Sequence, residues 1–152
     1  MSIFKRSNLV FAFIVVILIV CNIASLVEME HTKKLHEQLQ NQIDFDFKDN
    51  LKEVGDSLKR NIDWNSKFEY ALSHASKVQA LVDKTSFASG STKEARTVRS
   101  YGYMLESYFN NSKYATIDEN PQELEEFIKC LEILSTNPTD LEAANKLISL
   151  LN

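Results

Sequence analysis

The stretch LVFAFIVVILIVCNIASLV occupies residues 9–27 and contains no charged side chain. As an α-helix rising about 1.5 Å per residue, it would extend about 28 Å, close to the roughly 30 Å hydrocarbon core of a bilayer. Its Leu, Ile, Val and Phe side chains together favour membrane insertion by roughly 6 kcal/mol, whereas even a central charge would oppose insertion by only about 3 kcal/mol. The sequence therefore predicts a transmembrane helix in contact with membrane lipid over residues 9–27.

A cleaved secretory signal is the main alternative, because such signals also place an apolar core after basic residues. Cleavage needs small residues at the last and third-last positions before the cut. A cut after Ala24 would put Asn22 at the third-last position, and a cut after Ser25 would put Ile23 there. Neither site fits, and the run is longer than the usual signal core of about 7–15 residues. We therefore expect an uncleaved anchor.

The charges on either side of the run favour a cytoplasmic N-terminus. Residues 1–8 form a short head that carries Lys5 and Arg6, while the opposite flank has two glutamates before Lys33 and Lys34. Lys and Arg are retained on the cytoplasmic side and acids count for little, so this bias is small. Basic residues ahead of a first apolar helix also match an export signal. We expect a cytoplasmic head and an extracytoplasmic body at the cell membrane.

The chain beyond residue 27 is acidic and poor in residues that interrupt helices. It holds all 21 acidic residues and 15 of the 17 basic ones, a formal charge of 15 − 21 = −6. Nucleic-acid binding calls for a basic surface, so we expect no nucleic-acid partner. Three glycines and two prolines in 152 residues predict an all-α body. Cys21 lies in the apolar run, so Cys130 is expected to be a small core residue rather than half of a disulfide.

Residues 28–62 predict a long juxtamembrane helix that continues the anchor and packs on a bundle formed by residues 63–152. Its apolar positions are about 3.9 residues apart, a spacing that drifts around an ideal helix and does not form a heptad seam. Either one long helix passes successive neighbours, or the helix breaks or bends near residues 44–47, DFDF; we expect continuity at least over the first half. The apolar positions that follow this spacing in residues 28–62 are Leu35, Leu39, Ile43, Phe47, Leu51, Val54, Leu58 and Ile62.

Four helices are predicted within the bundle, and the last two form an αα-hairpin. The first extends over residues 65–84 and the second over residues 91–111, separated by a loop at residues 85–92; residues 110–120 form a polar connection before the third. Capping residues are expected at Ser66, Ser91, Asn120 and Thr139. The inward positions are Phe68, Ala71, Leu72, Ala75, Val78, Val82, Ala95, Val98, Tyr101, Leu105, Phe109, Leu124, Phe127, Ile128, Leu131, Leu134, Leu141, Ala144, Leu147, Ile148 and Leu151.

No motif for catalysis, cofactor binding or metal binding is present in the sequence. It lacks an HExxH pair, a Gly-rich phosphate loop, a nucleophile elbow and a CxxC pair, so we expect neither an enzyme nor a cofactor. His31 and His36 diverge by about 140° on a helix, which does not suit one metal ion. His74 adjoins an apolar face and is expected to be structural. Four acids interleave with lysines and predict a solvated face: Asp46, Asp49, Glu53 and Asp56.

Two polar features are candidates for contacts with other molecules. Asn22 could hydrogen-bond to another spanning helix, worth about 0.6–2 kcal/mol, or extend to the membrane interface. A basic patch around the serine-rich loop could pair with the acidic hairpin of its own molecule, a partner protein or anionic lipid, and internal pairing is the first expectation. This patch consists of Lys84, Lys93, Arg96 and Arg99.

We therefore expect a single-pass membrane protein that serves as a protein-interaction, assembly or regulatory component, through a protein partner or self-association. The alternative is a membrane-anchored sensor in which Tyr101, Tyr103 and the basic residues bind a small anionic molecule. Arg96 and Arg99 directed into a cavity would favour the sensor, and both on the outside would favour the interaction component. A second alternative is a secreted helical protein left after signal cleavage.

Overall fold

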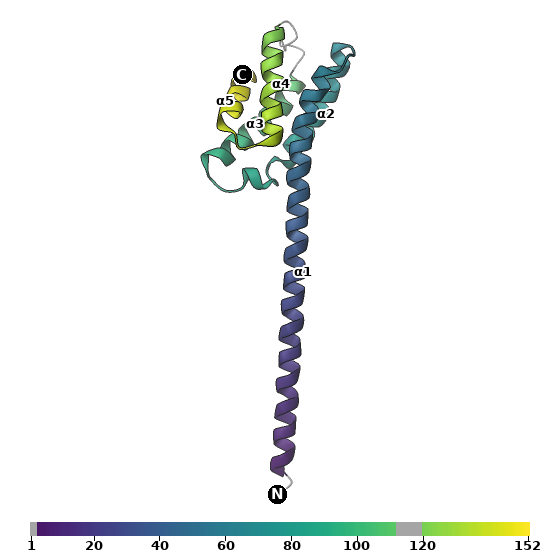
Figure 1. Cartoon of the computed structure of the whole chain (residues 1–152), viewed down its shortest axis with the longest axis vertical. Helices are drawn as coiled ribbons and strands as arrows, with labels where there is room; N and C mark the ends of the chain where they lie inside the picture. The colour runs from purple at the N-terminus through teal and green to yellow at the C-terminus, as the bar shows by residue number, and fades with distance from the viewer. Residues whose placement is uncertain (1–2, 112–119) are drawn as a thin grey trace. The chain divides into compact units, whose positions relative to one another are not determined.

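The computed structural model describes residues 3–111 and 120–152, with side chains for residue 13 and from residue 15 onward within those ranges. These ranges contain helices and no strand, which confirms the predicted all-α class (Figure 1). The helices are α1 (Ile3–Lys59), α2 (Trp64–Val82), the 3-10 helix η1 (Ser86–Ala88), α3 (Lys93–Asn110), α4 (Pro121–Thr136) and α5 (Leu141–Leu150).

Helix α1 continues through residues 44–47 without a break, which settles the choice between one long helix and two. The alternating DFDF sequence is compatible with a helix because its side chains have different surroundings. Phe47 is fully buried and Phe45 is 63% exposed, while Asp44 bonds to a distant segment. The chain forms two compact units, Met1–Leu39 and Gln40–Asn152, so the C-terminal part of α1 belongs to the unit that contains the bundle.

The second unit has one continuous apolar core. Helix α2 packs along α3, α4 packs on α5, and α3 also contacts α5 and η1. Helix α1 adds four side chains at helical spacing, and the ring of Phe47 lies 6.5 Å from the ring of Tyr101. The predicted inward positions are buried or partly buried throughout α2–α5, which confirms the hairpin and the periodicity. The four core residues from α1 are Phe47, Leu51, Val54 and Leu58.

Two glycines mark close approaches of helices in this unit. A Cβ atom placed on Gly102 of α3 would lie 2.6 Å from Cγ2 of Val82, which is far inside van der Waals contact. A Cβ atom on Gly55 of α1 would lie 3.6 Å from Cβ of Leu131, an ordinary contact distance. Gly102 therefore sets the distance between α2 and α3, whereas Gly55 leaves room for a methyl group.

Three of the four predicted capping residues are wrong by one to three positions. The Asp63 carboxylate accepts from the backbone N–H of Ser66 and caps α2, because it precedes the first helical turn by one residue. Thr92 rather than Ser91 caps α3, and Asp140 rather than Thr139 caps α5. Asn120 caps α4 as predicted, with Pro121 in the first turn. Most of the predicted connection over residues 110–120 lies outside the described residues.

Candidate functional site

The predicted membrane span presents exposed apolar side chains. All apolar side chains from Val15 to Val27 are exposed, and Phe13 is 66% exposed. One helix in the described ranges is long and apolar enough to cross a membrane; its 18-residue window has a mean hydropathy of 1.6 with none of its residues buried. A core helix of a soluble protein with this composition would be mostly buried. The described side chains of this segment thus form an exposed apolar surface.

Asn22 interrupts this apolar surface, and its amide is partly satisfied within the helix. Its Nδ2 donates to the carbonyl oxygen of Leu18 at 2.8 Å, one turn earlier. An amide has two N–H donors and an acceptor oxygen, so this bond leaves bonding capacity on Asn22. In hydrocarbon, where water does not supply partners, such capacity favours a hydrogen bond to another helix.

The members of the predicted basic patch have different surroundings: Lys84 is exposed, as are two of the three on α3. Arg99 of α3 is half-buried, and its guanidinium donates to the carbonyl oxygens of Ala88 and Gly90, the latter at 3.1 Å. Gly90 has a φ of 84°, a conformation that glycine adopts without strain. Lys93 and Arg96 are exposed. Arg99 is therefore a structural residue of the loop, and two basic side chains on α3 remain on the surface.

The expected pairing of this patch with the acidic hairpin is absent from the described ion pairs. Acidic side chains of α4 instead contact other lysines: Glu132 lies 2.5 Å from Nζ of Lys59, and Glu126 lies 2.8 Å from Nζ of Lys146. Lys59 is at the end of α1, so the first of these pairs connects α1 to α4. The acidic hairpin thus neutralises lysines of its own surroundings.

A hydrogen-bonded group that we name the Asp44 cluster joins α1 to the connection after α2. The Asp44 carboxylate accepts from Thr85 Oγ1 at 2.7 Å, Ser86 N at 2.7 Å and Ser86 Oγ at 2.5 Å. Gln40 donates to Asp44 and to the carbonyl oxygen of Lys84. Burial raises the pKa of Asp44, but the hydrogen bonds from Ser86, Thr85 and Gln40 outweigh it and hold that pKa below its usual value. The cluster fixes this connection and had not been predicted.

The aromatic residues proposed for ligand binding are engaged in internal hydrogen bonds. Tyr101 is fully buried and its hydroxyl donates to the carbonyl oxygen of Pro138 at 3.0 Å. Burial raises the pKa of this hydroxyl far above its usual value, so it remains protonated. Tyr103 is 42% exposed, and its hydroxyl donates to the Asp83 carboxylate. These residues therefore do not line one pocket.

His74 of α2 is half-buried next to α1, in agreement with a structural role. Its Nδ1 lies 2.9 Å from Oδ1 of Asn50, whose own Nδ2 donates to the carbonyl oxygen of Asp46. Nδ1 therefore acts as the donor toward Asn50. Burial lowers the pKa of His74, Lys77 and Arg60 lower it further, and Glu53 and Asp49 oppose them. The imidazole is therefore held mainly in its neutral form at neutral pH.

Two of the four interleaved acids of α1 form ion pairs with neighbouring basic side chains. Asp56 lies 3.2 Å from Lys59 and 3.4 Å from Lys52, and Glu53 lies 3.6 Å from Arg60. No group of three or more His, Cys, Asp or Glu side chains that could hold a metal ion occurs in the described ranges. These acids contribute to a charge-mixed helix surface.

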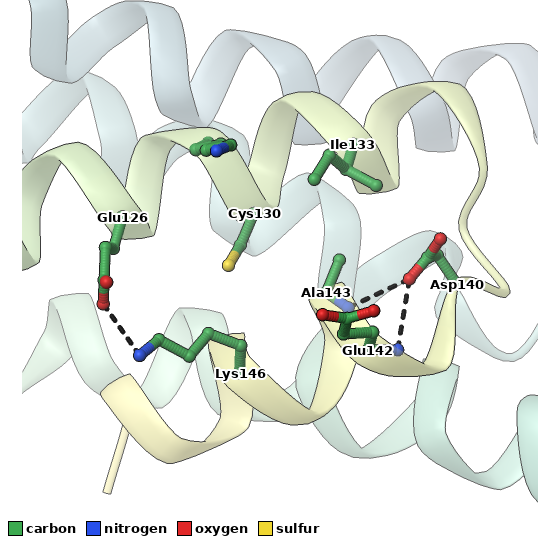
Figure 2. Close-up of a pocket in the computed structure, with 8 residues that line it drawn as sticks. Glu126, Cys130, Ile133, Asp140, Glu142, Ala143 and Lys146 are labelled. Carbon is green, nitrogen blue, oxygen red and sulfur yellow. Dashed lines mark hydrogen bonds and ion pairs between the residues drawn. The ribbon is translucent and has the colours of Figure 1, made fainter.

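A hollow of about 540 Å³ lies between α4 and α5, with the Cys130 thiol at its base (Figure 2). Glu126 and Lys146 form an ion pair across one end of the hollow (Figure 2). At the other end the Asp140 carboxylate accepts from the backbone N–H groups of Glu142 and Ala143 (Figure 2). Burial, and then Glu126, raise the pKa of Cys130, which makes its thiol unreactive. Three polar side chains around the hollow thus already have partners: Glu126, Lys146 and Asp140.

Comparison with known proteins gives no match for this chain, whether by family, by similar sequence or by solved structure.

Proposed function

We propose that the protein is a non-catalytic, single-pass membrane protein whose helical body acts as an interaction, assembly or regulatory component at the extracytoplasmic face. The observation that carries this proposal is the apolar window of α1, none of whose residues is buried. A surface of this length and composition is stable in a bilayer, and its insertion is favoured by roughly 6 kcal/mol. Residues 1–8 then lie in the cytoplasm.

An interaction role is favoured over anion sensing by the positions of the proposed ligand-binding groups. Arg99 binds loop carbonyls, and Tyr101 and Tyr103 bond to Pro138 and Asp83. Freeing them for a ligand would break the bonds that hold the loop and α5 in place. The exposed Lys93 and Arg96 instead present charge on the surface of α3, where a macromolecular partner has access.

Membrane retention can be tested by adding charge to the apolar window. The triple variant Val16→Arg, Leu18→Arg and Val20→Arg adds roughly 9 kcal/mol against insertion, which exceeds the favourable sum for the run. Alkaline carbonate washing of vesicles should release this variant and retain the wild type. A control with arginine at Leu35, Leu39 and Phe45, which are exposed apolar residues outside the run, should be retained.

Processing is checked on the purified chain, and orientation is checked on intact cells. The mass of the purified chain should include residues 1–27, and protease added outside intact cells should digest the body while leaving the head. Release of the wild type by carbonate, or an N-terminus near Ser25, would contradict the anchor and favour the secreted alternative.

The interaction role is tested by charge reversal on α3. Substitution of Lys93 and Arg96 by Glu should abolish specific crosslinks from the body to a membrane partner, while Glu125→Lys and Lys129→Glu, which change exposed charges on α4, should preserve them. Crosslinking identical in both variants would contradict this surface. A rise in melting temperature with phosphate or citrate, lost in Arg99→Gln, would favour the sensor.

A further inference from the structure

One face of α1 carries no formal charge from the apolar run to the end of the first compact unit. Its positions alternate steps of three and four residues, the spacing of a heptad seam, unlike the wider spacing farther along the helix. All glutamates and lysines between residues 28 and 39 lie outside this face. All six side chains are exposed, and Met29 and Leu39 are exposed by 66% and 56%. We name this face the α1 seam; it comprises Asn22, Ser25, Met29, Thr32, His36 and Leu39.

The α1 seam coincides with a shallow groove on the surface of the helix. Four seam residues line the groove, and Glu28 and Lys33 form its two edges. Two polar side chains bond to the backbone of their own helix. Thr32 Oγ1 donates to the carbonyl oxygen of Glu28 at 2.9 Å, and His36 Nδ1 lies 3.1 Å from the carbonyl oxygen of Thr32. This face can therefore pack against another helix without leaving these atoms unpaired.

We propose that a second copy of this chain packs on the α1 seam, giving a parallel homodimer. Glu28 and Lys33 are five residues apart and occupy the two positions that flank a heptad seam. In a parallel pair, Glu28 of each copy faces Lys33 of the other, whereas an antiparallel pair would bring like charges together. Parallel packing also follows if both copies insert in the membrane in the same direction, and in this respect the inference rests on the proposed anchor.

Asn22 supports a second copy rather than a different partner. A two-fold parallel pair places the same position of both helices side by side. The amide of Asn22 retains one N–H donor and its oxygen, so two copies can exchange hydrogen bonds across the seam while each keeps its bond to Leu18. A single asparagine at a seam position is a known determinant of register in parallel pairs. Ser25 is small and allows close approach of the helices.

Charge exchange tests the pairing across the seam. Glu28→Lys and Lys33→Glu should each weaken dimerisation of the full chain by about twofold to thirtyfold, measured by sedimentation equilibrium in density-matched detergent, and the double variant should restore it. The matched control exchanges Glu30 and Lys34, an ion pair of 3.3 Å within one helix, away from the seam. The control should leave dimerisation unchanged. If single substitutions at Glu28 or Lys33 weaken dimerisation no more than the same substitutions at Glu30 or Lys34, or if the double variant is no better than the singles, the parallel seam is overturned.

Asparagine substitution tests the contact within the membrane. Asn22→Val should weaken dimerisation by about threefold to thirtyfold, because the interhelical hydrogen bonds are lost. Ile23→Val changes a neighbouring position outside the seam and should have no effect. An Asn22→Val variant as dimeric as the wild type would contradict a seam that includes this residue.

Disulfide crosslinking in vesicles locates the seam directly. In a Cys21→Ala background, which keeps only the buried Cys130, one cysteine added at position 25, 29, 32 or 36 should give oxidised dimers, and one added at position 27, 30 or 34 should not. Uniform crosslinking, no crosslinking, or preference for the second set would overturn the proposal. Carbonate washing of the same vesicles separates the two proposals: a released chain contradicts the anchor, whereas a retained chain without the seam pattern contradicts only the dimer.

Discussion

Helix α1 belongs to two units, and its apolar side chains are buried in one and exposed in the other. In the unit Gln40–Asn152, the apolar residues of α1 recur at helical spacing and Phe47, Leu51 and Val54 are fully buried. In the unit Met1–Leu39, the described apolar side chains cover all sides of the helix and are exposed. A one-sided stripe is completed by neighbouring helices, whereas an all-round apolar surface is typical of a deeply buried helix or a membrane span. The distribution of apolar residues around the helix therefore separates the two roles.

The largest expected contrast is in the free energy of unfolding after the same leucine-to-alanine substitution in each unit. Leu51→Ala should lower the free energy of unfolding by about 2–5 kcal/mol, because it leaves a cavity in the core. Leu35→Ala, on the same helix but 48% exposed, should change it by less than about 0.5 kcal/mol. Denaturation of the full chain in detergent, followed by the fluorescence of Trp64, measures both. Similar losses in the two variants would contradict the division of α1.

The two helical glycines sharpen the picture of packing in the second unit. Gly102→Ala should destabilise the bundle by about 1–3 kcal/mol, because the new methyl group collides with Val82. Gly55→Ala should be neutral or stabilising by up to about 1 kcal/mol, since the methyl group has room and alanine favours helices. Thermal unfolding measures both variants. Stabilisation by Gly102→Ala would show that α2 and α3 are farther apart than described.

Acid titration distinguishes a carboxylate of the second unit from one of the first. Because the pKa of Asp44 is lowered on folding, its contribution to stability is present above the unfolded value of 3.8 and is lost as pH falls through the folded pKa. Asp44→Asn should cost about 1–2 kcal/mol at neutral pH and flatten stability below pH 3.8. Glu37→Gln, in an exposed 4.0 Å pair with Lys33, is the control and should do neither. If Asp44→Asn loses stability at acidic pH in the same way as the wild type, the Asp44 cluster is contradicted.

The smallest expected contrast is between His74 of the second unit and His36 of the first, in the pH dependence of stability. The pKa of His74 is lowered on folding, so the unfolded chain binds the proton more readily, and stability is lost as pH falls from the unfolded value of 6.5 through the folded pKa. His74→Gln should reduce this loss of melting temperature between pH 7 and pH 5. His36→Gln, on the exposed part of α1, should leave the profile of the wild type. The two profiles can be compared directly by scanning calorimetry.

Local sequence patterns predicted much of the fold and little of the polar structure. Helical periodicity identified the buried faces, since each inward position depends on neighbours three or four residues away. The capping errors at Ser66, Ser91 and Thr139 arise because several adjacent residues can accept the same hydrogen bond, and geometry selects one of them. The choice among Asp63, Ser66 and other candidates is not encoded in spacing alone.

Contacts between distant residues account for what sequence reasoning missed. Asp44 and Ser86 are 42 residues apart, and no local pattern links an acid on one helix to a loop hydroxyl. Arg99 was grouped with its neighbours by charge, but its position is determined by loop carbonyls. The serine-rich segment followed by an arginine was the only available signal. Such a signal is too common to identify a contact by itself.

Two side chains hold the connection between α2 and α3 by hydrogen bonds. The Asp44 carboxylate accepts from the backbone N–H of Ser86, and the Arg99 guanidinium donates to the carbonyl oxygen of Gly90. Its serine-rich composition would otherwise suggest a flexible strip suited to epitope insertion or proteolytic nicking. Both side chains bond to the backbone of this connection. A peptide inserted there would therefore break these hydrogen bonds and destabilise the bundle, in addition to lengthening the loop.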